Sequence, residues 1–369
     1  MSRNRVFRFS GWDVLNVAII PFQIAFYLAL AYAYPRLSPL VLVAIFPVLF
    51  AMSLQNAGAN HNHYHTPFFR ARWLNTLTSM GFSMTGAPKT PFNASHGVHH
   101  ATAQSWNDES LLGILGLRRP LHKQLIGAVS FAVESFGLRY FVLLYLLRTR
   151  PVEQVAKIAS PTQPELAVLV LNQIKQPETL RATKLDLAAW VAFRIALVAI
   201  DWRFFAFYFL PCTFVIEMIR QAENYFQHWG ASDPEDPKRD SVSCYGTLYN
   251  LLTFNLGYHQ EHHLRPGVHW RKLPRTTAEL PDDRRRVPFS HYINLPVVFP
   301  RVAAELAQKR AAAQAAQAAT AVGATGAAGA TPAAATTGAT ETSAPSRGSA
   351  AEQSPEPRPD RADDRVVVS

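Results

Sequence analysis

The sequence contains 13 histidines, and most of them lie in four short clusters. The clusters are HNHYH, HGVHH, NYFQH and HQEHH, with histidines at His61, His63, His65, His96, His99, His100, His228, His259, His262 and His263. Imidazole is the side chain that proteins use most often to bind metal ions. Nothing about a membrane or a soluble core calls for such clustering. The pattern therefore predicts a metal centre.

The spacing within each cluster fits one face of a helix. Residues three and four positions apart share a helical face, and every cluster except NYFQH contains histidines at one or both of these spacings. In NYFQH, Asn224 lies four positions before His228. His63 lies two positions after His61 and points to roughly the opposite side of a helix, so it ranks below the other nine histidines.

Nine imidazoles exceed the ligands that one transition metal ion accepts, which is about six. Two ions sharing nine histidines, with Asn224 or a water completing the set, is the simpler count. The competing interpretation is a set of surface histidines or separate weak zinc sites. Imidazole suits iron, zinc, copper and nickel alike, so the ligand type does not choose the metal.

The composition indicates an all-α integral membrane protein. Hydrophobic residues make up 49% and charged residues 17% of the chain, whereas about a quarter of a soluble domain is charged. The two cysteines, Cys212 and Cys244, exclude a disulfide framework, a four-thiolate zinc site and a cysteine-ligated iron–sulfur cluster.

Two apolar segments near the N-terminus predict a first membrane hairpin. The uncharged segment Val14 to Pro35 is long enough to cross a hydrocarbon core of about 30 Å. A second apolar segment, Leu37 to Leu54, follows a tight turn at Tyr34-Pro35-Arg36 and returns the chain to its starting side.

The later hydrophobic segments predict a second hairpin. We assign it to Leu187–Ile200 and Phe204–Arg220, broken at Asp201-Trp202-Arg203. The segment Gln124–Leu147 carries two charges, which are costly at mid-bilayer, so it fits an interfacial amphipathic helix better. An alternative exchanges the roles, so that Gln124–Leu147 spans and Leu187–Ile200 lies at the surface.

The basic residues favour one orientation. The net charge is +10, and with two hairpins the Lys/Arg clusters fall on the side of the N-terminus, which the positive-inside tendency makes cytoplasmic. Because the charges are scattered at loop ends, they indicate orientation beside anionic lipid and no nucleic-acid binding. An even number of spans separates the histidine clusters, so all four lie on this cytoplasmic face with both termini.

The expected architecture is therefore about four transmembrane helices in two hairpins, plus interfacial helices and a cytoplasmic histidine-rich cap. Residues 1–300 form the catalytic domain in this interpretation. Residues 301–369 are a low-complexity Ala/Thr/Pro-rich tail, which cannot bury enough apolar surface to fold and is expected to be disordered.

The boxes HNHYH, HGVHH and YHQEHH, each beside an apolar segment, resemble the membrane fatty acid desaturase superfamily, whose three histidine boxes hold a non-haem di-iron centre. The run YHQEHHLRPGVHWRKLP, Tyr258 to Pro274, is similar to that family's third box. NYFQHWG resembles the segment before the third box in desaturases and in the related membrane alkane hydroxylases. The resemblance covers roughly residues 10 to 280.

Carried over by position, the resemblance implies two iron ions (Fe2+/Fe3+). Their ligands would be His61, His65, His96, His99, His100, His228, His259, His262 and His263. Asn224 would lie near the metal through a water. The extra His63 leaves open which two histidines of the first box bind iron, although His61 and His65 are favoured because they share a helical face. Asp108 and Glu261 either accept the second ring N–H of ligand histidines or are ordinary loop carboxylates.

The resemblance implies O2-dependent desaturation of a fatty acyl chain that enters from the bilayer. The sequence holds no flavin, haem or ferredoxin motif, so electrons come from a separate donor of ferredoxin, rubredoxin or cytochrome type. Basic residues near the third box (Arg265, Arg271, Lys272, Arg275) either dock an acidic donor or anchor the protein to anionic head groups.

Two other functions compete with desaturation. The same centre can hydroxylate an alkyl or acyl chain, because the outcome depends on how the carbon is placed relative to the metals. A histidine-rich metal carrier is the other candidate, and it predicts polar residues inside the spans. The first predicted hairpin is free of charge, which disfavours the carrier.

Overall fold

The computed structural model describes residues 6–102, 137–160, 163–228, 231, 233, 236–282, 284 and 286–288. By its contacts the chain divides into two units, Met1–Ala303 and Ala304–Ser369, and all of the described residues belong to the first. Within them the regular structure is helical, with two isolated β-bridges and no strand. The predicted tail, Asp108 and residues 124–136 of the predicted interfacial helix lie outside the described residues.

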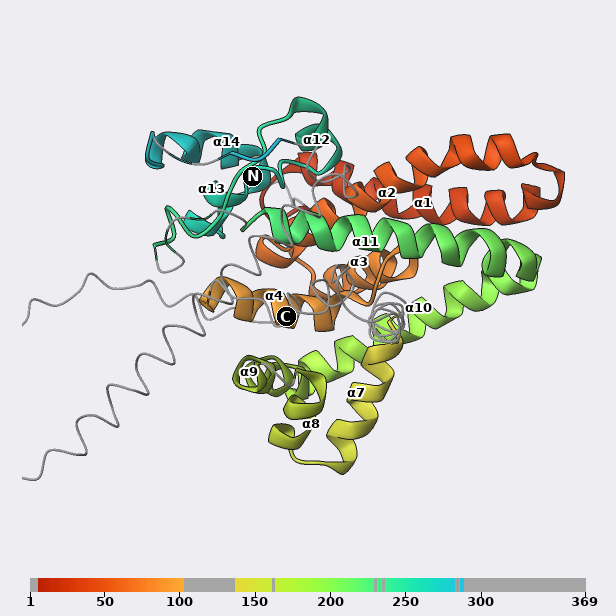
Figure 1. Ribbon diagram of the computed structural model, residues 1–369, viewed down its shortest axis with the longest axis horizontal. Helices are drawn as coiled ribbons and strands as arrows, with labels where there is room; N and C mark the ends of the chain where they lie inside the picture. Colours follow the sequence, from red (N-terminus) through yellow and green to blue (C-terminus); the bar gives the residue numbers. More distant parts are fainter. Residues whose placement is uncertain are drawn as a thin grey trace, which may run out of the picture. The chain divides into compact units, whose positions relative to one another are not determined.

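The first hairpin consists of α1 (Val14–Ala33) and α2 (Pro39–His65), joined by the short helix η2 (Tyr34–Arg36). The two helices lie side by side in Figure 1. Ser38 begins α2 as its N-cap, since its Oγ accepts a hydrogen bond from the backbone N–H of Val41 at 3.4 Å, and Pro39 occupies the first turn, where no N–H is needed.

Helix α2 continues well past the predicted end of the apolar segment at Leu54. Its last part is polar but buried, from Asn56 to His63. The side chain of Asn56 donates to Thr85 Oγ1 at 2.8 Å, so this polar part is held by hydrogen bonds to a neighbouring helix. The first histidine cluster is therefore a direct continuation of an apolar helix, and that helix fixes the position of the cluster along its axis.

The second hairpin is formed by α10 (Pro177–Phe204), the π-helical turn η3 (Phe205–Phe209) and α11 (Leu210–Phe226). The predicted break is confirmed at Asp201, whose backbone is non-helical (φ −156°, ψ 106°). Its carboxylate accepts the backbone N–H of Arg203 at 2.8 Å, which caps the returning helix. Helix α10 packs on α1, and α11 packs on α2 (Figure 1).

Three helical stretches are long and apolar enough to cross a membrane: Gly11–Arg36, Pro39–His65 and Pro177–Glu217. The third stretch contains the break at Asp201, so it includes parts of both helices of the second hairpin. The hairpins share an apolar core in which Tyr27 contacts Phe193 and Phe209 edge to face.

Arg194 is a charged residue of α10 that lies within the predicted span Leu187–Ile200. Its guanidinium donates to the carbonyls of Met84 at 2.8 Å and Gly86 at 3.1 Å, and it stacks 3.9 Å from the ring of Trp190. These carbonyls lie at the C-terminal end of α3 (Arg72–Thr85), where a cation also complements the helix dipole. The charge is thus stabilised by carbonyl groups and an aromatic ring inside the helix bundle.

The remaining described helices lie outside the two hairpins. They are η1 (Gly11–Asp13), α4 (Lys89–Thr102), α7 (Leu138–Thr149), α8 (Val152–Ala159), α9 (Pro164–Lys175), α12 (Thr247–Leu252), α13 (His259–Leu264), η4 (Trp270–Lys272), α14 (Leu273–Thr276) and η5 (Thr277–Glu279). Helix α4 packs on α9 and α10, and α7, α8 and α9 share a second apolar core. Helices α3, α8 and α9 have no counterpart in the sequence prediction.

A close backbone approach brings the third histidine box onto α2. At Gly58 a Cβ atom would collide with the carbonyl of Thr253, so only glycine allows this crossing. One turn later, Asn62 Nδ2 donates to the carbonyl of Phe254 at 3.2 Å. Phe254 and Asn255 have positive φ angles of 53° and 66°, which turn the chain toward α13 and its histidines.

Candidate metal centre

Histidines from four segments converge on two neighbouring points. The segments are the end of α2, α4, the turn after α11, and α13. Group one consists of His61, His65, His96, His100 and His262, and group two consists of His99, His228, His259 and His263. Within each group the available ring nitrogens lie within 4.8 Å of one another. The structure thus brings together the nine histidines that the helical spacing selects.

In group one, ring nitrogens face each other at short range. His96 Nε2 lies 3.0 Å from Nε2 of both His65 and His100, and His100 Nε2 lies 3.0 Å from Nε2 of His262. Nitrogen ligands lie about 2.1 Å from a first-row metal ion, so two of them at right angles are about 3.0 Å apart. These separations therefore fit imidazoles arranged around one ion.

His61 supplies a further observation in group one. Its ring centroid lies 4.3 Å from that of His262 and 4.6 Å from that of His96. Its Nε2 atom is buried and has no hydrogen-bond partner among the described residues. An unpaired buried nitrogen costs free energy unless something binds it, and a metal ion among these rings would do so.

In group two, His228 has a defined tautomer. Its Nδ1 lies 2.9 Å from the backbone carbonyl of Asp240, and a carbonyl only accepts, so Nδ1 carries the proton. The lone pair of His228 is then on Nε2, which lies 3.0 Å from Nε2 of His259. This arrangement presents a metal-binding nitrogen to the interior of the group.

The side chain of Asp240 orients a second ring of group two. Its Oδ2 lies 2.9 Å from Nδ1 of His263, whose Nε2 is buried without a hydrogen-bond partner in the described part of the chain. Burial raises the pKa of Asp240 to about 7, and a cation at Nε2 of His263 favours the ionised, accepting form. A carboxylate behind a histidine ligand fixes its tautomer and raises its basicity.

Six rings outside α2 are held in the neutral form that binds metal. Burial, with the neighbouring histidines as a smaller cause, lowers the pKa of His228 to about 3 and holds the pKa of other rings well below its usual range: His96, His100, His259, His262 and His263. Neutral imidazole is the species that donates a lone pair to a metal.

His63, the extra histidine of the first box, lies outside both groups. Its Nε2 lies 3.3 Å from Oδ1 of Asn75, and its ring packs edge to face on Phe68 with centroids 5.0 Å apart. It points away from the centre, as the i+2 spacing predicts. Asn224 is half-buried on α11, one helical turn before His228.

Glu261 fits neither expectation for it, because in the described part of the chain it contacts none of the nine clustered histidines and it is not a solvated loop carboxylate. It is fully buried, and it accepts hydrogen bonds from Ser243 Oγ at 2.7 Å, Tyr245 OH at 2.7 Å and Thr277 Oγ1 at 2.6 Å. Glu261 therefore ties α13 to the segments on either side of it and acts on the position of the third box as a whole.

The sequence interpretation missed Asp240. Four acidic residues occupy the segment between NYFQH and HQEHH: Asp233, Glu235, Asp236 and Asp240. No local pattern distinguishes them, because the contact with His263 spans 23 positions and forms only in the folded chain.

The sequence is similar to a known protein family and to two known proteins. Residues 37–293 match the family model described as fatty acid desaturase. The chain is 30% identical over 108 residues to a sphingolipid delta(4)-desaturase of Candida albicans, covering 25% of this chain and 27% of that protein. It is 44% identical over 57 residues to sphingolipid delta(4)-desaturase DES1 of Rattus norvegicus, covering 15% of each chain.

The matched regions thus span well under half of either relative's length. No solved structure is significantly similar to the chain. The family model, by contrast, extends over most of the sequence, from before the first histidine box to beyond the third. On that match, and with its three histidine boxes folded into two facing groups, the chain belongs to the fatty acid desaturase family.

Proposed function

We propose that this protein introduces a double bond into a lipid chain in an O2-dependent reaction. The observation that carries the proposal is the convergence of nine imidazoles into two groups. Family membership and the three apolar helical stretches, which make this a membrane protein, support it. No side chain of the twenty amino acids can remove hydrogen from an unactivated methylene, so the reaction requires a cofactor.

Two iron ions (Fe2+/Fe3+) are the proposed cofactor, one held by group one and the other by group two. When bound, they supply the O2 activation that the reaction needs. Two buried nitrogens that have no hydrogen-bond partner among the described residues, on His61 and His263, support the fit of a metal at each group. The all-nitrogen donor set is compatible with iron, and the family resemblance favours it over zinc.

The protein's own residues prepare this site in three ways. Asp240 holds His228 and His263 with their outer nitrogens protonated. Burial keeps six of the rings outside α2 neutral. Helices α2 and α11 carry the apolar core of the hairpins toward the histidines as far as Met52 and Ile216, so a lipid chain can approach the centre along this apolar part.

We further propose that the second hairpin contributes two spans, which gives four in total. The single apolar stretch Pro177–Glu217 is broken at Asp201 and reverses there (Figure 1). With both termini in the cytoplasm, the histidines lie on the cytoplasmic face, where a separate ferredoxin, rubredoxin or cytochrome can deliver electrons.

The substrate class follows from the relatives' names. Both named relatives are sphingolipid delta(4)-desaturases, so a saturated sphingolipid chain is the first substrate to test beside ordinary fatty acyl lipids. Expression with a compatible electron donor, followed by mass spectrometry of total lipids, distinguishes the outcomes. Products that lack two hydrogen atoms support desaturation, whereas products that gain one oxygen atom indicate the alternative, a membrane di-iron hydroxylase.

Two variants make this experiment specific. His262→Ala removes a nitrogen of group one and should abolish product. His63→Ala, on the opposite side of α2 from the centre, should retain it. Two results would contradict the proposal: no change in the lipids of a host that expresses the wild-type protein, or the same amount of product from the His262→Ala variant.

A further inference from the structure

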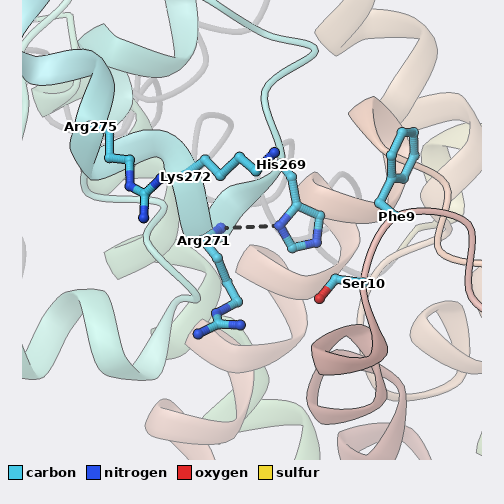
Figure 2. Close-up of a pocket in the computed structure, with 6 residues that line it drawn as sticks. All are labelled: Phe9, Ser10, His269, Arg271, Lys272 and Arg275. Carbon is cyan, nitrogen blue, oxygen red and sulfur yellow. Dashed lines mark hydrogen bonds between the residues drawn. The ribbon is translucent and has the colours of Figure 1, made fainter.

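A basic pocket lies where the N-terminal segment meets the chain that follows the third histidine box. It is lined by Phe9, Ser10, His269, Arg271, Lys272 and Arg275, and its volume is about 310 Å³. Figure 2 shows the three cationic side chains on the side of η4 and α14, with Phe9 and Ser10 opposite them and His269 between. We propose that this pocket binds the phosphate group of an anionic membrane phospholipid.

The charges in the pocket lack an internal counter-ion. Arg271, Lys272 and Arg275 are exposed, and no described carboxylate forms an ion pair with any of them. The nearby Arg265 differs, since it is paired with Glu279 at 2.8 Å. Three unpaired cations around one concave site favour a bound anion, and a phosphate oxygen is a strong acceptor for both guanidinium and ammonium groups.

The pocket lies at the beginning of the first apolar stretch. That stretch starts at Gly11, immediately after Phe9 and Ser10. Trp12 is 53% exposed, and the guanidinium of Arg271 lies 4.4 Å from its ring centroid. Exposed tryptophan at the end of a membrane helix is typical of the head-group layer, and basic pockets at this depth bind lipid head groups.

The size of the pocket argues for a small group and against a protein. A cavity of this volume accommodates a phosphate with part of its glycerol, whereas a protein partner needs a much larger and flatter surface. The half-exposed ring of Phe9 offers apolar surface beside the cations, as a lipid requires and a free phosphate ion does not. These features favour the lipid source of phosphate.

The pocket is mechanically connected to the third histidine box. Asp13, fully buried, accepts hydrogen bonds on Oδ1 from His269 Nε2 at 2.9 Å and Trp270 Nε1 at 3.0 Å. These contacts tie the start of α1 to the segment that begins six positions after His263. A lipid phosphate bridging the two walls of the pocket would hold that same junction together.

The proposal is tested on the purified full-length protein in a neutral detergent. Short-chain phosphatidylglycerol and phosphatidylcholine are titrated separately, and binding is measured by native mass spectrometry. The test variant is Arg271→Gln/Lys272→Gln/Arg275→Gln, and the charge-matched control is Lys175→Gln/Arg181→Gln/Lys184→Gln, which removes three exposed cations from α9 and α10.

We expect saturable binding of phosphatidylglycerol over phosphatidylcholine in the wild type. Because each cation contributes about one kcal/mol toward an anionic lipid surface, the triple variant should bind on the order of 100-fold more weakly, and the control should match the wild type. Equal loss in both variants, or equal affinity for the two lipids, overturns the proposal.

A labelling experiment on the wild-type protein tests the same site without relying on the fold of the triple variant. A phosphatidylglycerol with a photoreactive group near its phosphate should label wild-type peptides that contain Phe9 or Arg271, and labelling elsewhere overturns the assignment. Inorganic phosphate should not compete at lipid-equivalent concentrations. If inorganic phosphate competes with the lipid, the pocket is a phosphate site and the lipid proposal is refuted. If an acidic ferredoxin competes and its binding requires the same three cations, the pocket is a docking site for that protein and the lipid proposal is likewise refuted.

Discussion

The carboxylate of Asp240 lies 2.9 Å from Nδ1 of His263. The backbone carbonyl of the same residue lies 2.9 Å from Nδ1 of His228. One residue in a segment without regular structure therefore orients two of the four imidazoles in group two, and both are left with Nε2 available to a metal.

Asp240→Asn should weaken metal binding at group two. The amide is uncharged and no longer raises the basicity of His263, and loss of such a partner typically costs about 10–100-fold in metal affinity or activity. The measurement is metal content after dialysis against graded chelator. Asp236→Asn is the control, since Asp236 is half-buried, pairs loosely with Arg239 at 3.9 Å and accepts the backbone N–H of Lys238, which its amide oxygen can still accept. Equal metal retention by both variants would refute the role of Asp240.

Two neighbouring histidines of α2 should behave differently when replaced. His65→Gln removes a nitrogen that lies 3.0 Å from His96 Nε2, so we expect loss of metal from group one and loss of activity. His63→Gln disturbs the contact with Asn75 and the packing on Phe68, and it should cost at least about 1 kcal/mol of stability with metal content unchanged. Metal analysis of both purified variants checks this, and the reverse pattern would be incompatible with the arrangement of α2.

Glu261→Gln should lower stability more than metal content. Glu261 accepts three hydroxyl hydrogen bonds and is fully buried, and an amide leaves at least one of these hydroxyls without an acceptor. A loss of about 1–3 kcal/mol in unfolding free energy is expected, measured by thermal unfolding in detergent. Glu279→Gln, at an exposed ion pair, should change little. If Glu261→Gln lost metal while its melting temperature stayed constant, a direct role at the centre would be indicated.

Lys89 should make stability depend on pH. Burial lowers the pKa of Lys89 from 10.5 to about 7, with Arg220 also lowering it and Glu217 and Asp186 raising it. Between about pH 7 and 10.5 the unfolded chain binds more protons than the folded one, so this lysine destabilises the fold increasingly as pH falls through that window.

Lys89→Met removes this effect. The variant should exceed the wild type by at least about 1 kcal/mol near pH 7, and the difference should shrink as pH rises toward 10. Unfolding midpoints measured across this range provide the test, with the exposed Lys184→Met as control. A difference that is independent of pH would show that Lys89 is charged in the fold.

Sequence periodicity predicted which histidines come together, because the i, i+3 and i+4 spacing is a local property of a helix. The same reasoning placed His63 on the opposite side of its helix. It also located the break at Asp201, since a charged Asp-Trp-Arg triplet interrupts two apolar segments.

The remaining features depend on contacts between distant segments. The partner of His263 is Asp240, the acceptor for Arg194 is the end of α3, and Gly58 is required by Thr253. None of these pairings has a local signature. The burial of the polar end of α2 was likewise missed, because composition alone does not show that neighbouring helices supply its hydrogen bonds.

Metal content of the purified wild-type protein tests the central claim most directly. Elemental analysis, with iron present during expression, should give about two iron ions per chain, as expected when two groups of imidazoles each bind one ion, and His262→Ala together with His263→Ala should reduce the ratio sharply. Labile zinc in place of iron, or an iron content that does not depend on these two histidines, would contradict the di-iron account.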